Sequence, residues 1–272
     1  MPLMAEEIRA LIKRGEIIEE IRVRRFGESL VLLSGGRAVR LLARADGALE
    51  RLLLDVCSGS VYAHRDSIIS GYVPMACGVR VGVAGRAGYD GELVGIRDIS
   101  LLVFRIPLRE APIGRELYRE WLNRGEKNTL IISPPCGGKS TALFSLLSRI
   151  AKDGGRRTVA VDERCEADTE ALLNAGVDVL SGYRRQKGIE IAVRTLSADV
   201  LACDEIFTEG DSEALLLAHG SGVTVIASTH ARDKEGLKER EGLRPLLDKG
   251  VFKTLFTLGR RGSEFTFSVS EL

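Results

Sequence analysis

The chain has 272 residues, of which 44% are hydrophobic and 28% charged, and its formal net charge of +1 gives no basic excess to indicate a nucleic-acid partner. Aromatic residues make up 5%, which argues against a base-stacking surface, and the five widely spaced cysteines form no CxxC pair, so neither a disulfide framework nor a zinc site is predicted. No apolar run is long enough to span a bilayer, so a membrane location would depend on a partner.

The first part of the chain, up to about Pro112, has the pattern of an α+β domain. Apolar residues at helical spacing predict helices over Met4–Lys13 and Arg44–Cys57. Short strands are expected over residues 22–33, 38–42, 79–83 and 101–107. We therefore expect a smaller α+β domain over residues 1–110, with a linker at Pro107–Pro112.

From Asn128 onward, strands alternate with helices. Strands are expected over residues 129–132, 158–161, 176–180, 200–203 and 223–227, and helices over 115–124, 141–152, 188–196 and 212–219. This alternation predicts a mostly parallel sheet covered by helices, that is, an α/β domain over residues 111–272. The apolar stretches 251–258 and 263–270 flank a Gly-Arg-Arg-Gly turn and predict a terminal antiparallel hairpin.

A candidate phosphate-binding loop lies between the first predicted strand and helix of this domain. It follows the pattern G-x-x-x-x-G-K-[ST], with Ser133 in place of the first glycine. Backbone N–H groups of such a loop surround phosphate oxygens, and the helix that follows directs its positive end at the anion. We expect Lys139 to reach the β- and γ-phosphates of ATP and Ser140 to bind Mg²⁺. The predicted nucleotide-binding residues are Ser133, Pro134, Pro135, Cys136, Gly137, Gly138, Lys139, Ser140 and Thr141.

Two carboxylates follow the apolar strand Val200–Cys203, which we expect to lie beside the phosphate-loop strand. Asp204 is predicted to hold Mg²⁺, and Glu205 to polarise the water that attacks ATP. The alternative is a solvated acidic turn, but its position downstream of a phosphate loop favours function.

Further candidate catalytic residues lie near other strand ends. Glu163 belongs to an acidic cluster after the strand 158–161, and this cluster could add a carboxylate near the metal or water. His230 ends the strand that carries Ser228 and Thr229, whose hydroxyl groups could sense the γ-phosphate. Arg194 could contact phosphate in its own subunit or a neighbour's, or could be a solvated helix residue.

These motifs together resemble the RecA-like ATPases of type II and type IV secretion and pilus systems. The resemblance rests on the phosphate loop, the acidic box Asp162–Glu166, the strand to Asp204-Glu205, and Ser228-Thr229-His230. Segments such as 60–64, 71–74 and 132–135 are similar to the stage III sporulation protein AA family of endospore-forming bacteria.

The resemblance implies a RecA-like P-loop domain that hydrolyses ATP with Mg²⁺ as the motor of a secretion-like channel between mother cell and forespore. It also implies a homo-hexamer in the cytoplasm on the mother-cell side, recruited to the membrane by a membrane-protein subunit of the channel complex. Arginines of the N-terminal domain would complete the nucleotide site in such rings, and Arg80, Arg97 and Arg105 are the candidates.

Two other functions remain open from the sequence. A DNA-stimulated RecA-like ATPase would need a basic groove and aromatic platforms, and the composition indicates neither. A regulatory nucleotide-binding module would bind ATP with little turnover, so the rate of hydrolysis separates it from a motor.

Overall fold

The computed structural model describes residues 2–45, 47–75, 78–106, 113–134, 137–261 and 264–272. The chain divides into two compact units, Met1–Pro107 and Leu108–Leu272. The domain boundary predicted between residues 110 and 111, and the predicted linker Pro107–Pro112, lie outside the described residues.

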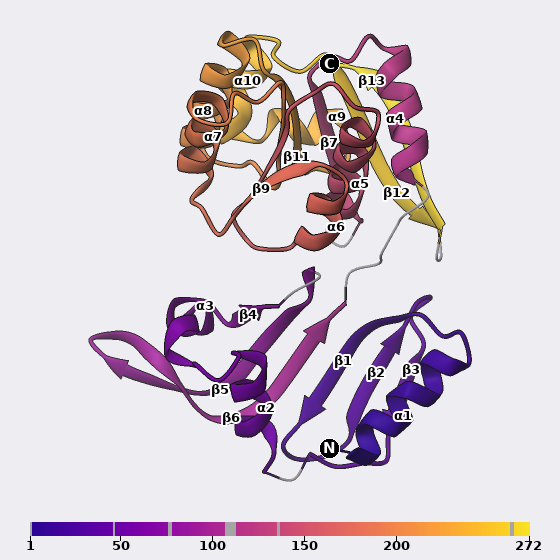
Figure 1. Ribbon diagram of the computed structural model, residues 1–272, viewed down its shortest axis with the longest axis vertical. Helices are drawn as coiled ribbons and strands as arrows, with labels where there is room; N and C mark the ends of the chain where they lie inside the picture. Colours follow the sequence, from indigo (N-terminus) through magenta and orange to yellow (C-terminus); the bar gives the residue numbers. More distant parts are fainter. Residues whose placement is uncertain (1, 46, 76–77, 107–112, 135–136, 262–263) are drawn as a thin grey trace. The chain divides into compact units, whose positions relative to one another are not determined.

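The N-terminal unit is built on an antiparallel sheet of six strands in the order β3-β2-β1-β6-β5-β4 (Figure 1). Its strands are β1 Ile18–Arg24, β2 Ser29–Leu33, β3 Ala38–Leu41, β4 Tyr72–Pro74, β5 Arg80–Asp90 and β6 Glu92–Arg105. The segment 22–33 is therefore two antiparallel strands with a turn between them. Gly35 and Gly36 form the β2–β3 turn with φ of 87° and 83°, values that favour glycine in such hairpins.

Helices pack against this sheet through a shared apolar core. They are α1 Pro2–Lys13, α2 Leu49–Val56 and α3 Arg65–Ile69, and the 3₁₀ turn η1 Tyr62–His64, which buries no residue, precedes α3. Burial alternates along β2, whose Val31 and Leu33 face the core together with Met4 of α1 and Leu49 of α2. The predicted helix 44–57 begins only at Leu49, after Gly47, whose φ of 74° does not fit a helix.

The C-terminal unit contains a seven-stranded sheet in the order β13-β12-β7-β11-β10-β8-β9. Its strands are β7 Thr129–Ser133, β8 Thr158–Asp162, β9 Val177–Ser181, β10 Val200–Cys203, β11 Thr224–His230, β12 Thr254–Arg261 and β13 Glu264–Glu271. The pairs from β12 to β9 are parallel, and only the β12–β13 hairpin among these described strands is antiparallel. Both the mostly parallel sheet and the terminal hairpin agree with the prediction.

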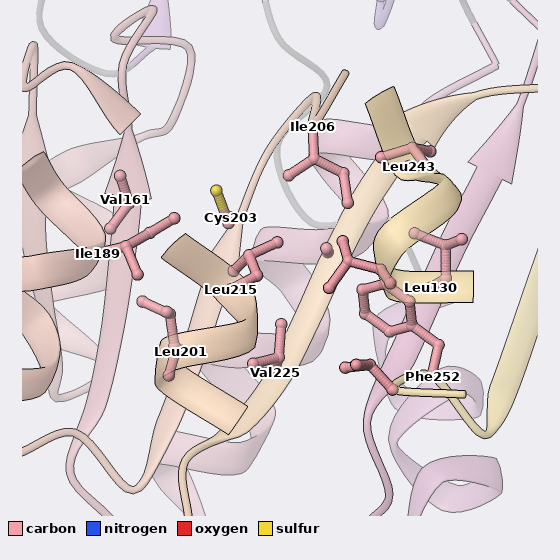
Figure 2. Close-up of a cluster of buried hydrophobic side chains, with 14 of the residues drawn as sticks. Leu130, Val161, Ile189, Leu201, Cys203, Ile206, Leu215, Val225, Leu243 and Phe252 are labelled. Carbon is pink, nitrogen blue, oxygen red and sulfur yellow. The ribbon is translucent and has the colours of Figure 1, made fainter. Parts of the chain in front are cut away.

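Helices cover both faces of this sheet, so its central strands are buried along their whole length. The helices are α4 Ile113–Asn123, α5 Lys139–Lys152, α6 Thr169–Asn174, α7 Arg185–Arg194, α8 Glu209–Gly220, α9 Lys234–Lys238, the 3₁₀ turn η3 Glu241–Leu243 and α10 Arg244–Asp248. Figure 2 shows one core, where Leu201 and Val225 of the strands pack with Ile189 of α7 and Leu215 of α8. On the other face, Leu117 and Trp121 of α4 pack with the buried side of α5.

The predicted adjacency of the Asp204-Glu205 strand and the phosphate-loop strand is wrong. Strand β11 lies between them, pairing with β10 on one side and with β7 on the other. All three strands are short and apolar, and hydrophobic periodicity carries no information on lateral order. Asp204 consequently meets Ser228 of β11 first, not the phosphate loop.

No helix in the described part of the chain combines the length and apolar character needed to cross a membrane.

Candidate functional site

The carboxyl ends of the parallel strands meet at one edge of the C-terminal sheet. His230 of β11 is paired in register with Ser133 of β7, and Cys203 of β10 with Val161 of β8. The segments that follow these strands carry most of the predicted site residues. Ligands of open α/β sheets bind at this edge, which makes it the candidate site.

The phosphate loop has the backbone geometry that its glycines predict. Gly138 precedes α5 with φ of 81°, a left-handed conformation that side chains disfavour. A Cβ on Gly137 would lie 2.4 Å from Ser133 Oγ, so only glycine fits there. Helix α5 then begins at Lys139, whose side chain is only 5% exposed. Pro135 and Cys136 lie outside the described residues.

Four side chains from four segments form a continuous chain of contacts. Lys139 Nζ lies 2.9 Å from His230 Nδ1, and His230 Nε2 lies 3.1 Å from Glu205 Oε1. The other oxygen of the same carboxylate, Glu205 Oε2, forms an ion pair with Arg164 Nη1. The structure therefore brings together the predicted residues Lys139, His230 and Glu205, and adds Arg164.

The segment that carries Asp204 and Glu205 is fixed to β11 by hydrogen bonds. The Ser228 hydroxyl donates to Asp204 Oδ1 and accepts from the Glu205 backbone N–H at 3.1 Å. The Thr229 hydroxyl donates to the carbonyl of Ile206 at 2.8 Å. Glu205 has φ of 52°, an uncommon value for a residue with a side chain, which persists where the surroundings hold the backbone in place.

The side chains predicted to hold Mg²⁺ are oxygen donors, which this ion prefers, and Mg²⁺ is usually held by one or two protein groups together with phosphates. The predicted ligands are the Ser140 hydroxyl and Asp204, and Asp204 is 8% exposed. Ser140 Oγ also donates to Glu166 Oε2 at 3.4 Å, which adds a carboxylate beside it. Among the described residues, no three or more His, Cys, Asp or Glu side chains cluster into a metal site. A Mg²⁺ ion bound largely through phosphates does not depend on such a cluster.

Glu163 is paired with an arginine that sequence reasoning did not single out. Arg185 Nη2 lies 2.9 Å from Glu163 Oε2, and Arg185 Nη1 lies 3.0 Å from Asp211 Oδ2. Arg185 is 4% exposed and Asp211 fully buried. Burial works against the charged guanidinium, but Cys203 and the carboxylates of Asp211 and Glu163 raise the pKa of Arg185 overall. The catalytic role of Glu163 remains a prediction.

Arg194 is not brought to the carboxyl edge of its own sheet. It ends α7, nine residues after Arg185, which corresponds to about 13 Å along the helix axis. Its guanidinium is exposed and pairs with Glu190 at 3.3 Å. Within this chain, Arg164 and Arg185 occupy the places near the acidic strand ends. In the sequence, the cues to these two residues are that Arg164 directly follows Glu163 and that Arg185 begins α7.

A depression of 730 Å³ opens next to the phosphate loop. Its lining comes from the loop, the end of β11 and the segment that follows: Ser133, Pro134, His230, Ala231, Arg232, Asp233, Glu235, Gly236, Glu239 and Arg240. The volume falls in the range of about 300–1,000 Å³ typical of ligand pockets, and its lining includes charges of both signs.

Two of the three N-terminal candidate arginines, Arg80 and Arg105, contact side chains of their own unit. The Arg80 guanidinium lies 4.1 Å from the centre of the Tyr72 ring, and Arg105 Nε lies 3.6 Å from Glu20 Oε2. Arg97 is paired in register with Arg86 in the β5–β6 ribbon. Their proposed contribution to a nucleotide site remains a prediction.

A phosphate loop between β7 and α5, with β11 separating β7 from β10, defines the RecA-like class of P-loop NTPases. The chain belongs to the family described as "Sporulation stage III, protein AA", whose profile matches residues 2–267. It is 31% identical over 264 residues to stage III sporulation protein AA of Bacillus subtilis, covering 92% of this chain and 85% of that protein.

Solved ATPase structures share this fold. The pilus retraction motor PilT with bound ADP matches with a TM-score of 0.67 at 14% identity, covering 98% of this chain and 82% of PilT. The ATPase DotB of Legionella pneumophila matches with a TM-score of 0.66 at 14% identity, covering 98% of this chain and 78% of DotB. At this identity the likeness concerns the fold.

Proposed function

We propose that this chain binds Mg·ATP at the phosphate loop and hydrolyses it. The observation that carries the proposal is the convergence of Lys139, His230 and Glu205 at the start of α5. The loop that precedes α5 has a position, Gly137, at which only glycine fits. A buried lysine at a helix N-terminus is suited to a phosphate group.

The residues have distinct parts in the proposed reaction. Lys139 and the backbone N–H groups of the loop bind the phosphates, and a phosphate competes with His230 for the lysine ammonium group. Ser140 and Asp204 would hold Mg²⁺, which neutralises phosphate charge when bound. Glu205 accepts a proton from the attacking water, and Ser228 fixes the loop that presents it.

The experiment compares Lys139→Ala with Lys152→Ala, an exposed lysine at the far end of the same helix. Calorimetry measures the affinity for Mg·ATP, and phosphate release measures turnover. We expect Lys139→Ala to lose binding or turnover, while Lys152→Ala resembles the wild type. Near-wild-type turnover in Lys139→Ala would contradict the assignment.

We further propose that the ATPase is the motor of a secretion-like channel apparatus of endospore formation. The family membership and the fold shared with PilT and DotB support this reading. The motor would be a cytoplasmic homo-hexamer on the mother-cell side, recruited by a membrane-protein subunit of the channel complex. Native mass spectrometry with a non-hydrolysable ATP analogue tests the ring, and a monomer under all conditions would exclude it.

A further inference from the structure

Arg164 lies where the ends of two neighbouring strands face each other. Strands β8 and β10 pair in parallel with Val161 opposite Cys203, so the segments after them are adjacent. The Arg164 guanidinium reaches across to the Glu205 carboxylate. The arginine side chain is 44% exposed and the glutamate 14%, so the arginine is the solvent-facing partner of this pair.

The pair is the outer end of the chain of contacts that begins at the phosphate loop. Lys139 contacts His230, His230 contacts one oxygen of Glu205, and Arg164 holds the other. Both oxygens of the proposed base are thus engaged. A cation lies at each end of the chain, and a triphosphate attracts both.

We propose that Arg164 contacts the terminal phosphate of ATP in its own subunit, moving there from Glu205. The inference rests on the proposed ATPase function. A guanidinium binds phosphate oxygens through two parallel hydrogen bonds, and the charge of a triphosphate exceeds that of one carboxylate. Movement of Arg164 also frees Glu205 Oε2 to accept a proton, so that binding of the substrate exposes the base.

The chemical step is a hydrolysis in which Arg164 transfers no proton. The water oxygen bonds to the γ-phosphorus while the bond from that phosphorus to the β,γ-bridging oxygen breaks. The bonding electron pair leaves with ADP, and a proton of the water passes to Glu205 and then to solvent. Arg164 stabilises the negative charge on the transferred phosphoryl group, as an arginine finger does.

Two other arginines of this unit are less suited to the role. Arg185 is buried and held by two carboxylates, so moving it would leave Asp211 as a buried, unpaired charge. Arg194 lies about 13 Å further along α7 and is paired with Glu190. Arg164 combines contact with the proposed base and an exposed side chain.

The test uses Arg164→Gln, with Arg184→Gln as a matched control because Arg184 is an exposed arginine of a neighbouring loop. Calorimetry measures the affinities for Mg·ADP and for Mg·ADP with aluminium fluoride, which mimics the phosphoryl group in transfer. We expect Arg164→Gln to leave the Mg·ADP affinity within about twofold. We also expect it to weaken the aluminium fluoride complex and lower kcat by at least about 10²-fold, since arginine fingers contribute about 10³–10⁵.

The conservative variant and the opposite outcomes complete the test. Arg164→Lys should restore little of the turnover that Arg164→Gln loses, because a lysine cannot form the bidentate contact with phosphate. Unchanged or faster turnover in Arg164→Gln means that the arginine only restrains Glu205, and equal loss of both affinities means that its role is structural; either result overturns the proposal. A wild type that neither binds nor hydrolyses Mg·ATP refutes the ATPase function itself, whereas an active wild type with an active Arg164→Gln refutes only the role of Arg164.

Discussion

The dipeptide Asp-Glu occurs at the carboxyl ends of both β8 and β10, and the two copies have different surroundings. Asp162, the last residue of β8, is buried, and its carboxylate accepts hydrogen bonds from the backbone N–H groups of Glu166 and Ala167 at 3.0 and 2.9 Å. Glu163 then pairs with the buried Arg185. After β10, by contrast, the aspartate is held by a hydroxyl of β11 and the glutamate contacts an imidazole and an exposed guanidinium.

The difference lies in the partners, not in the acidic residues themselves. The first glutamate, Glu163, pairs with Arg185, which also pairs with the buried Asp211. Asp211 in addition accepts hydrogen bonds from the backbone N–H groups of Phe207 and Thr208 at 3.1 and 3.0 Å. The second glutamate contacts the exposed Arg164 and the imidazole of His230, which in turn contacts the phosphate-loop lysine. We therefore expect substitutions at the β8 end to act mainly on stability, and those at the β10 end mainly on turnover.

The largest effect on this comparison is expected from Glu205→Gln. Removing a general base lowers turnover by about 10²–10⁴-fold, and the amide preserves the shape of the side chain, so Mg·ATP should still bind. Phosphate release and calorimetry measure the two properties, with the exposed Glu209→Gln as control. If Glu163→Gln lowers turnover more than Glu205→Gln does, the assignment of the two strand ends is reversed.

A somewhat smaller effect, on stability, is expected from Arg185→Met. Breaking a buried ion pair leaves an uncompensated charge at Asp211 and destabilises by about 3 kcal/mol, the lower part of the usual range because Glu163 is partly exposed. Urea denaturation measures the free energy of unfolding. Lys187→Met, which changes an exposed residue of the same helix, is the control and should have little effect. Equal stability of the two variants would show that the network contributes nothing.

The smallest effect is expected at Asp199, which directly precedes β10 and therefore lies at the opposite edge of the sheet from the two Asp-Glu pairs. Hydrogen bonds from the Arg157 side chain and backbone lower the pKa of Asp199 to about 2. Because the folded pKa lies below that of an unfolded aspartate, the pair stabilises the protein above about pH 4, and this stability is lost as the pH falls toward 2. The pair is partly exposed, so solvent screening keeps the effect small.

The measurement is the melting temperature of the wild type and Asp199→Asn between pH 7 and pH 2. We expect a deficit of a few degrees in the variant at neutral pH, which disappears toward pH 2. A constant deficit at every pH would mean that the carboxylate charge is not the cause.

The sequence predicts the second unit better than it predicts the contacts between its strand ends. The buried strands and the Gly-Gly-Lys-Ser turn each have a local pattern, so β7, the loop and α5 follow from one continuous segment, residues 129–152. The contacts of Arg164 and Arg185 join residues 22 to 41 positions apart, and the pairing of β11 with β7 joins residues 97 positions apart. Nothing in a local pattern specifies such pairs, because many charged residues compete for each partner.

The position of His230 has a mechanical consequence. It ends β11 and itself lines the 730 Å³ depression, together with Ser133 of the phosphate loop and Ala231. The imidazole that contacts the Lys139 ammonium group therefore also forms part of the wall of an open hollow. A molecule held in that hollow would touch the end of the strand whose side chain contacts the lysine, so that filling the hollow and filling the loop would act on the same imidazole.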